Sequence, residues 1–159
     1  MSAAMRRLGW MLAAISLWGA GMASGAPLDA RLDDDVTLRE RGAYVARLGD
    51  CAGCHTVKGG KPFAGGKAVN SPLGKIYATN ITPDPQKGIG AYTLSDFERV
   101  MREGIRRDGA HLYPAMPYAS FTSMTDVDVR ALYAYLMHDV APVAESPPQT
   151  ALPFPFDQR

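Results

Sequence analysis

Five consecutive residues, Cys51-Ala52-Gly53-Cys54-His55, constrain this 159-residue chain more than any other feature. They contain both cysteines of the chain, three positions apart, followed directly by a histidine. Two thiols at this spacing can reach the two vinyl groups on one edge of a porphyrin and form thioethers, and the next residue can bring its imidazole beneath the iron. Ala52 and Gly53 are small enough to let the backbone lie close to the ring. The motif therefore predicts one covalently attached haem c, bound through Cys51 and Cys54, with His55 as an axial iron ligand.

Two other kinds of site also use closely spaced cysteines. A thioredoxin-like Cys-x-x-Cys motif lies within a βαβ pattern, which this sequence does not show. A zinc site needs two further cysteine or histidine ligands at suitable spacing, whereas the remaining histidines, His111 and His138, are distant and isolated. Haem attachment is therefore the interpretation that the sequence favours.

The second axial ligand is open among several residues. Met101 and Met137 lie at helical spacing on apolar faces, so we expect them to pack in the core. Met116 lies between two prolines in a loop before the last predicted helix, and a stiff loop can hold a weak, neutral thioether over the iron. Met124, at the start of that helix, His111, or no protein ligand at all are the alternatives. We favour Met116 as the second metal ligand.

The first 26 residues have the layout of a secretory signal peptide. Arg6 and Arg7 form a basic start, residues 8–22 are apolar and uncharged, and small residues follow. We expect cleavage between Ala23 and Ala26 and localisation in the periplasm. An uncleaved membrane anchor is the alternative, although the apolar stretch is short beside the roughly 20 residues that a spanning helix needs.

The charge distribution does not indicate nucleic-acid binding, which usually needs a dense basic face. Of the 17 Lys and Arg residues, two lie in residues 1–26, which contain no acid; the other 15 accompany 16 Asp and Glu, a net charge of −1. One stretch whose single acid is Asp84 carries five lysines, namely Lys58, Lys61, Lys67, Lys75 and Lys87. If these five lysines form a basic rim, they can steer an acidic redox partner towards it. An ordinary solvated loop surface is an equally open interpretation.

Capping patterns and apolar periodicity predict the first two helices of an all-α domain. The first starts at Thr37, with Glu40 as its capping-box partner, and runs towards the cysteine motif. The second has Ser95 and Glu98 in the same arrangement and ends near Gly104. Little strand signal accompanies them.

The third helix begins at Thr125, with Asp128 three residues on. Its predicted buried face consists of Val129, Leu132, Tyr133, Leu136 and Met137. Between the first two helices, residues 58–94 form a loop rich in glycine and proline, with a short extended segment possible at 74–81. A loop of this length is usually functional, and a large prosthetic group enclosed by it would replace much of the core.

These signals divide the chain into four parts. Residues 1–26 are the signal peptide, 27–36 a lead-in, 37–143 the haem domain, and 144–159 a proline-rich strap that we expect to be extended and not packed.

Several stretches together resemble one family, the cytochrome c subunits of membrane-associated alcohol, gluconate and sorbitol dehydrogenases, with related cytochromes paired with molybdenum hydroxylases. The similar stretches are Arg41 to His55, Lys61 to Gly66, Gly74 to Asp84, Gly104 to Tyr118, and Met124 to Val143. The resemblance covers most of the predicted domain and is far more specific than Cys-x-x-Cys-His alone.

The resemblance implies the all-α cytochrome c fold, in which the first and last helices cross and long loops wrap one haem. Gly42 would then allow close approach to Leu132 or Tyr135. The resemblance also supports Met116 as iron ligand. Four further residues would lie near the haem or its propionates, and ordinary core or turn roles are the alternative for them: Tyr77, Asn80, Tyr113 and Tyr118.

A histidine and a thioether saturate the iron, which favours one-electron transfer over oxygen or peroxide chemistry. We therefore expect an electron-transfer protein, not an enzyme, that accepts electrons from a periplasmic quinoprotein, flavoprotein or molybdenum dehydrogenase. Its acceptor would be a quinone, another cytochrome or a terminal oxidase. An open-site haem enzyme or gas sensor is the alternative. The resembling subunits usually carry three haem modules, so this chain is either a single-haem relative or a piece of a larger subunit.

Overall fold

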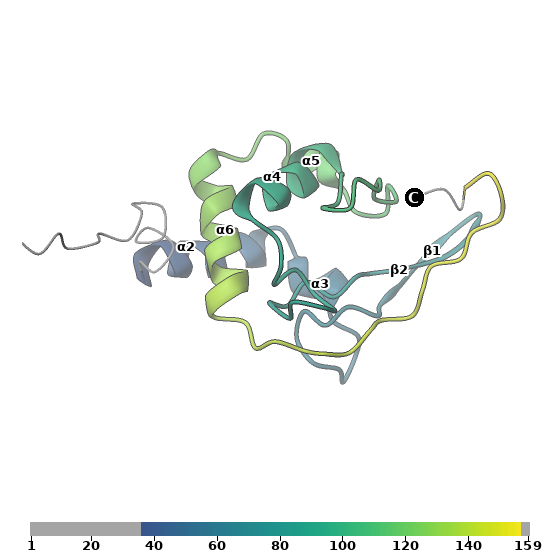
Figure 1. The fold of residues 1–159 in the computed structure, drawn as a ribbon, viewed down its shortest axis with the longest axis horizontal. Coiled ribbons are helices and arrows are strands. Elements are labelled where there is room, and N and C mark those ends of the chain that lie inside the picture. Colours follow the sequence, from purple (N-terminus) through teal and green to yellow (C-terminus); the bar gives the residue numbers. More distant parts are fainter. Residues whose placement is uncertain (1–35, 157–159) are drawn as a thin grey trace, which may run out of the picture.

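The computed structural model describes residues 36–156. Its elements are α2 (Val36–Leu48), α3 (Cys51–His55), β1 (Ala68–Ser71), β2 (Gly74–Tyr77), α4 (Leu94–Glu103), α5 (Tyr118–Phe121) and α6 (Asp126–His138). Figure 1 shows the three longer helices gathered on one side and the β1–β2 hairpin projecting from the other. The fold is mostly helical, as predicted. The predicted signal peptide and most of the predicted lead-in lie outside the described residues.

Helices α2 and α6 pack directly against each other, and Gly42 lies at their contact. A Cβ atom at Gly42 would lie 2.0 Å from the carbonyl oxygen of Ala131 and 2.6 Å from Cβ of Tyr135. Tyr135 was one of the two neighbours expected there, whereas Leu132 instead belongs to the buried core. No larger residue fits at Gly42 unless one of the two helices moves.

The core lies between α2, α4 and α6. The largest fully buried side chains include Leu132, Leu136 and Val129, all on the predicted buried face of α6. Tyr133 and Met137, predicted on the same face, are partly buried against this core. Met101 of α4 is also buried, as expected of a core methionine.

A short β-hairpin is the main departure from the all-α prediction. Strands β1 and β2 are antiparallel, and their register pairs Ala68 with Tyr77 and Ser71 with Gly74. The connecting tetrapeptide Ser71-Pro72-Leu73-Gly74 has proline second and glycine fourth, which suits a tight turn. The expected extended segment at 74–81 is therefore half of a hairpin, because the turn brings an upstream partner strand beside it.

The N-terminal cap of α4 lies two residues upstream of the predicted position. Thr93 Oγ1 accepts a hydrogen bond from the Asp96 amide, and the Asp96 carboxylate accepts one from the Thr93 amide. Ser95 and Glu98, predicted to form this box, lie inside the helix instead. Two overlapping hydroxyl-x-x-acid patterns occur here, and the upstream pattern lets the helix begin earlier. At the other end Gly104 forms the predicted cap, with a φ of 67°.

The caps of α2 and α6 differ in how well the sequence predicted them. Thr125 caps α6 and accepts a hydrogen bond from the Asp128 amide at 3.1 Å, as predicted. Helix α2 already includes Val36, so Thr37 lies in its first turn and is not its cap. The Thr37–Glu40 spacing is also that of two neighbours on a helix surface, which explains the wrong prediction.

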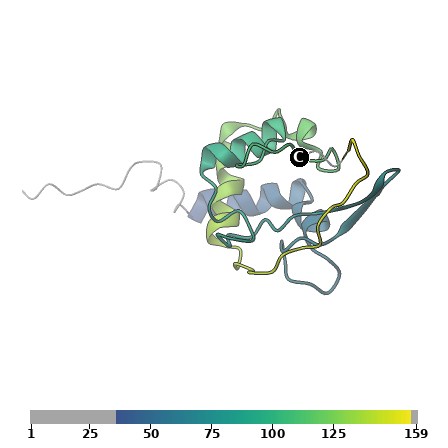
Figure 2. The same cartoon turned by 45° about the vertical axis from the view of Figure 1, so that its right-hand side comes forward.

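The strap after α6 is extended but packed, contrary to the expectation that it would be unpacked. Leu152 is buried, and the Glu145 carbonyl oxygen accepts a hydrogen bond from Asn80 Nδ2 at 3.1 Å. Further along, Thr150 Oγ1 accepts a hydrogen bond from the Tyr77 amide of β2 at 2.9 Å. Figure 2 shows this segment, in yellow, following the loop region and the hairpin.

Within residues 36–156, no helix combines the length and apolar character needed to cross a bilayer.

Candidate haem-binding site

The cysteine motif forms a separate turn of helix, α3, and does not continue α2. Asp50 separates the two helices in the left-handed conformation, with φ 49° and ψ 36°. The Gly53 amide donates to the Asp50 carbonyl oxygen at 3.0 Å. A Cβ atom at Gly53 would lie 2.2 Å from the Asp50 carboxylate, so a larger residue there would make the exposed Asp50 side chain rotate away. The chain therefore changes direction at Asp50, before the cysteine motif.

The two thiols are both free but differ in environment. Cys51 is half-buried against the hydrophobic core, whereas Cys54 is exposed. Burial raises the pKa of the Cys51 thiol to about 11. Reactive redox cysteines have lowered pKa values, so this environment does not suit a thioredoxin-like dithiol. The environment of Cys51 is instead suited to a thiol that forms a permanent covalent bond, such as a thioether.

The His55 imidazole is oriented by one hydrogen bond. Its Nδ1 lies 2.7 Å from the carbonyl oxygen of Thr79. A carbonyl oxygen can only accept, so Nδ1 carries the proton, and Nε2 of a neutral ring keeps its lone pair. Burial lowers the pKa of His55, although the bond to Thr79 acts in the opposite direction. The neutral form with a free Nε2 is the form that ligates a metal, and a carbonyl partner at Nδ1 is typical of metal-bound histidines.

Backbone contacts hold the Thr79 carbonyl beside the histidine. The Gly65 amide donates to the His55 carbonyl oxygen at 2.7 Å, and the Ile81 amide donates to the Phe63 carbonyl oxygen at 2.9 Å. A Cβ at Gly65 would lie 2.6 Å from the Thr79 carbonyl oxygen, so glycine permits this close approach. Sequence reasoning missed the role of Thr79, because a backbone carbonyl leaves no side-chain signal.

Asn80 is 4% exposed, and its side chain is fully used by the protein itself. Nδ2 donates to the carbonyl oxygens of Val143 and Glu145, at 2.7 and 3.1 Å. Oδ1 accepts from the amide and the hydroxyl of Thr82, at 2.8 and 2.7 Å. A primary amide has two donors and two such acceptor positions, so none remains for a haem propionate. This geometry favours the structural alternative for Asn80.

The three predicted tyrosines have different surroundings. The Tyr113 hydroxyl is buried and has no hydrogen-bond partner within the described part of the chain. Tyr118 packs its ring against Gly104, where a Cβ would lie 2.6 Å from Tyr118 Cε1. Tyr77 is half-buried at the end of β2. Tyr113 therefore has the orphaned polar atom that a buried carboxylate group of a ligand would satisfy.

The candidates for the second axial ligand separate into two groups. Met116 and Met124 are both partly buried against the core, whereas His111 is exposed. His111 pairs by its backbone with Ile105 in an isolated bridge. The Met124 carbonyl oxygen accepts a hydrogen bond from Arg102 at 3.0 Å. Burial thus keeps both methionines as candidates and disfavours His111.

The described chain contains each kind of donor that a covalent haem would use. Cys51 and Cys54 supply free thiols, and His55 supplies an unprotonated nitrogen. Met116 adds a half-buried thioether, and Tyr113 a buried hydroxyl without a partner in the described chain. Within residues 36–156, no group of three or more His, Cys, Asp or Glu side chains could hold a metal ion.

A family comparison identifies the class of protein that this fold and site define. The Cytochrome c family matches residues 40–139, a range that includes the cysteine motif, Met116 and the whole of α4 and α6. The chain belongs to the cytochrome c family, and the resemblance noted from the sequence is confirmed.

Curated relatives narrow the comparison to cytochrome subunits of dehydrogenases. Over 136 residues the chain is 53% identical to the cytochrome c subunit of a quinone alcohol dehydrogenase from Gluconacetobacter polyoxogenes, a match that covers 86% of this chain and 29% of the relative. It is 51% identical over 133 residues to the gluconate 2-dehydrogenase cytochrome c subunit of Pantoea cypripedii, covering 82% and 30%. It is 55% identical over 120 residues to the fructose dehydrogenase cytochrome subunit of Gluconobacter japonicus, covering 75% and 25%. The chain thus spans less than a third of each of these relatives.

Proposed function

We propose that this chain is a periplasmic single-haem electron carrier that takes electrons one at a time from a dehydrogenase and is not itself an enzyme. The observation that carries the proposal is the His55 Nδ1–Thr79 hydrogen bond of 2.7 Å, next to two free thiols. It orients a neutral imidazole for iron in a motif made for covalent haem attachment. When bound, the haem supplies reversible one-electron chemistry.

The residues of the chain have distinct roles in this proposal. Cys51 and Cys54 would attach the ring, and His55, through Nε2, and Met116 would bind the iron. Tyr113 would donate its hydroxyl hydrogen to a propionate. The first and last helices cross at Gly42, and the loops between them wrap the ring. A closed coordination sphere changes little on reduction, which favours electron transfer over small-molecule binding.

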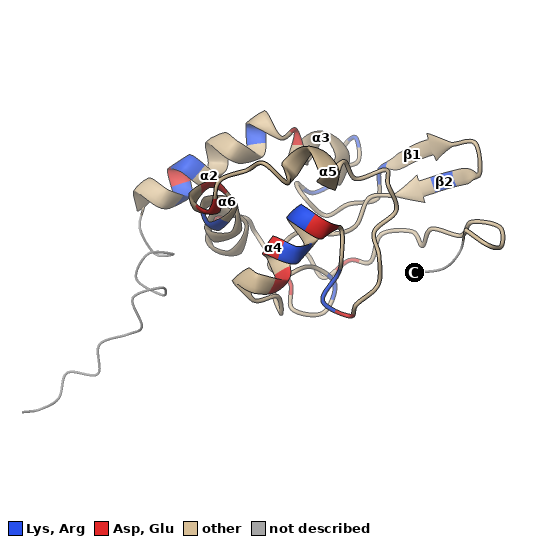
Figure 3. Ribbon diagram, turned by 90° about the horizontal axis from the view of Figure 1, so that it is seen from above, with Lys and Arg blue, Asp and Glu red and all other residues tan. Residues whose placement is uncertain are grey.

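The proposed partner is a dehydrogenase of the quinoprotein, flavoprotein or molybdenum class, and the acceptor a quinone, a cytochrome or an oxidase. The relatives named above are cytochrome subunits of dehydrogenases, which supports this partnership. The five lysines of the predicted rim are all exposed, and Figure 3 shows basic residues in blue on β2 and on loops as well as on α2 and α4. A basic surface of this kind suits an acidic partner.

The ligation is tested by the absorption spectrum of the purified ferric holoprotein. A haem with a methionine ligand has a weak band at the red edge of the visible spectrum. We expect the unmodified protein to show this band, Met116→Ala to lose it, and the matched variant Met124→Ala to retain it. The thioether also favours the reduced form, so the Met116→Ala reduction potential is expected to fall.

Ligand binding to the unmodified holoprotein distinguishes a saturated iron from the open iron site of a haem enzyme or gas sensor. Rapid binding of carbon monoxide to the reduced unmodified protein, or of cyanide to the oxidised one, would contradict a saturated iron. Loss of the band in Met124→Ala alone would move the ligand to Met124. A colourless exported protein with two titratable thiols would contradict haem binding altogether.

A further inference from the structure

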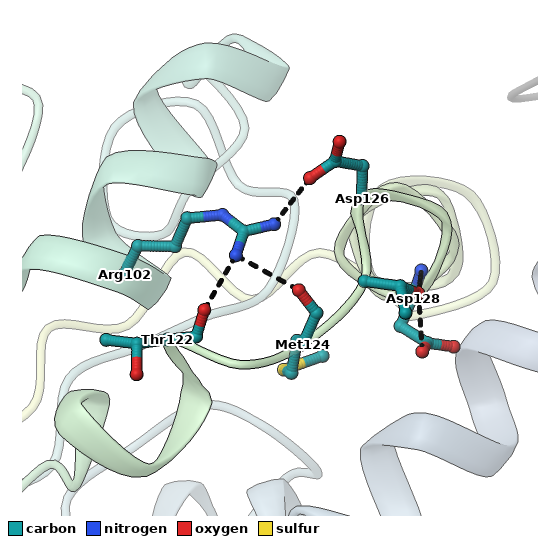
Figure 4. A network of polar contacts seen from close by, with 6 residues as sticks. Arg102, Thr122, Met124, Asp126 and Asp128 are labelled. Carbon is teal, nitrogen blue, oxygen red and sulfur yellow. Dashed lines mark hydrogen bonds and ion pairs between the residues drawn. The ribbon is translucent and has the colours of Figure 1, made fainter.

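Arg102, in the last turn of α4, holds the segment that connects α5 to α6 (Figure 4). Its Nη1 atom donates to the carbonyl oxygens of Thr122 and Met124, at 2.9 and 3.0 Å. Its Nη2 atom donates to Asp126 Oδ1 at 2.7 Å. The arginine side chain is 26% exposed, while that of Asp126 is 92% exposed. The contact to the Met124 carbonyl oxygen is part-buried and therefore better shielded from water than the ion pair, whereas the contact to Thr122 is exposed.

The planar guanidinium suits this task better than any other side chain. Its donors have fixed directions, so one group restrains several acceptors at once. The acceptors at residues 122 and 124 are main-chain carbonyl oxygens, which are present whatever side chains those two residues carry. Arg102 therefore sets the position of this backbone relative to α4.

The same end of α4 contacts the other end of the loop that carries Met116. The Gly104 carbonyl oxygen accepts a hydrogen bond from the Leu112 amide at 2.7 Å. The Tyr118 ring packs on Gly104, where there is no space for a Cβ atom. The segment 104–126 thus contacts the C-terminal end of α4 before Met116, at Leu112, and after it, at Tyr118 and at residues 122–126.

The backbone hydrogen bonds of Met116 itself are local. Its amide donates to the Tyr113 carbonyl oxygen at 3.2 Å, and its carbonyl oxygen accepts from the Tyr118 amide at 2.9 Å. These bonds shape the turn but link it to no helix other than the short α5 at Tyr118. The position of the Met116 thioether therefore depends on its own packing against the core and on how firmly the loop is held on either side of it.

We propose that Arg102 is a positioning residue for the second axial ligand of the iron. By tying residues 122–126 to α4, it limits the opening of the loop that would withdraw the Met116 sulfur. Local opening of this kind exposes a coordination site without unfolding the domain. The inference rests on the proposed His55/Met116 ligation.

The test compares ferric holoproteins in which Arg102 or its surroundings are changed. In Arg102→Gln we expect cyanide to bind about tenfold faster, since charge-assisted hydrogen bonds that oppose loop opening are lost. We also expect the red-edge band to disappear on heating before the helical circular dichroism is lost. In the unmodified protein the two losses should nearly coincide.

Three further variants separate loop restraint from other effects of the substitution. Asp126→Asn removes the exposed ion pair but keeps both carbonyl contacts, so it should behave almost like the unmodified protein. Arg106→Gln is the matched control, because the Arg106 side chain pairs with Asp108 within its own turn. Arg102→Lys keeps the charge but cannot reach all three acceptors, so it should fall between the two extremes; it also serves if Arg102→Gln does not fold.

The outcomes distinguish this inference from the proposed function. If the unmodified protein has the band, Met116→Ala lacks it and Arg102→Gln and Arg102→Lys bind cyanide no faster, the ligation stands and the role of Arg102 is overturned. An equal effect of Asp126→Asn would assign the effect to the ion pair and overturn the carbonyl restraint. If the unmodified protein lacks the band, both the Met116 ligation and the role of Arg102 are overturned.

Discussion

At the scale of single residues, Asn80 shows how burial decides a role that sequence leaves open. The resemblance places it near the haem, yet its amide joins the strap to the segment beside the His55 acceptor, Thr79. Thr82, with no exposed surface, completes this cluster by bonding both Asn80 and the Val143 amide. Asn80 is therefore central to the attachment of the strap.

Replacing this side chain should loosen the strap and lower stability. Asn80→Ala leaves buried carbonyl, amide and hydroxyl groups without partners, and we expect it to lower the free energy of unfolding by about 3 kcal/mol. Urea denaturation of the holoprotein measures this change. A glutamate-specific protease should also cleave faster after Glu145, whose carbonyl oxygen is held by Asn80.

Thr150→Ala is the matched control for Asn80→Ala. It removes a strap contact at the half-buried Tyr77 amide, and we expect a cost of about 1 kcal/mol or less. Equal effects of the two variants would contradict the central role of Asn80.

At the scale of elements, the helix caps show which local signals were sufficient. Thr125 and Asp128 form the predicted cap of α6, and Gly104 ends α4 as predicted. The predicted start of α4 was wrong because two capping patterns overlap within six residues. Local sequence alone does not show which of the two hydroxyl residues caps the helix. The choice depends on where the preceding chain is held, which is a property of the folded protein.

The cap of α6 carries a pH-dependent contribution to stability. The hydroxyl of Thr125 holds the pKa of Asp128 below its ordinary value of 3.8, with help from the guanidinium of Arg41. A lowered pKa means that the contribution is fully present above pH 3.8 and is lost as the pH falls through the folded-state pKa.

We expect Thr125→Ala to lower the free energy of unfolding by about 1 kcal/mol at pH 7. The difference from the unmodified protein should shrink as the pH falls below 3.8 and through the lower folded-state pKa of Asp128, because the carboxylate then becomes protonated in the unmodified protein too. Urea unfolding followed by circular dichroism between pH 7 and pH 3 measures this. Ser123→Ala, a hydroxyl loss at an exposed residue two positions earlier, is the control and should change little. If the difference in free energy of unfolding between the two proteins grew on acidification, the expected direction of the pH dependence would be contradicted.

At the scale of the whole molecule, the exposed lysines do not form a uniform rim. Lys61 pairs with Glu145 of the strap, and Lys67 donates to the Gly53 carbonyl oxygen of the cysteine motif. The other three, Lys58, Lys75 and Lys87, form no ion pair within the described part of the chain. Those three are the charges most available to a partner.

We expect the chain to co-purify with a dehydrogenase from native extracts. The triple variant Lys58→Gln, Lys75→Gln and Lys87→Gln should be reduced by that partner about tenfold more slowly at low salt, because steering by charge is lost. Stopped-flow reduction at several ionic strengths measures this rate, and Arg106→Gln is the control. A monomer without any partner in extracts would contradict the subunit assignment, and an unchanged rate would contradict the lysine surface.

The sequence by itself determined the cofactor chemistry, the class of fold and the family, because these depend on contiguous patterns. Cys51 to His55 carries the attachment chemistry in five residues, and the apolar face of α6 follows from its 3.6-residue period. The tertiary structure decided which atoms assist those residues. The contact of His55 with the Thr79 carbonyl, that of Asn80 with the strap at Glu145 and that of Arg102 with the Thr122 carbonyl all join segments at least 20 residues apart, and no local pattern encodes such contacts.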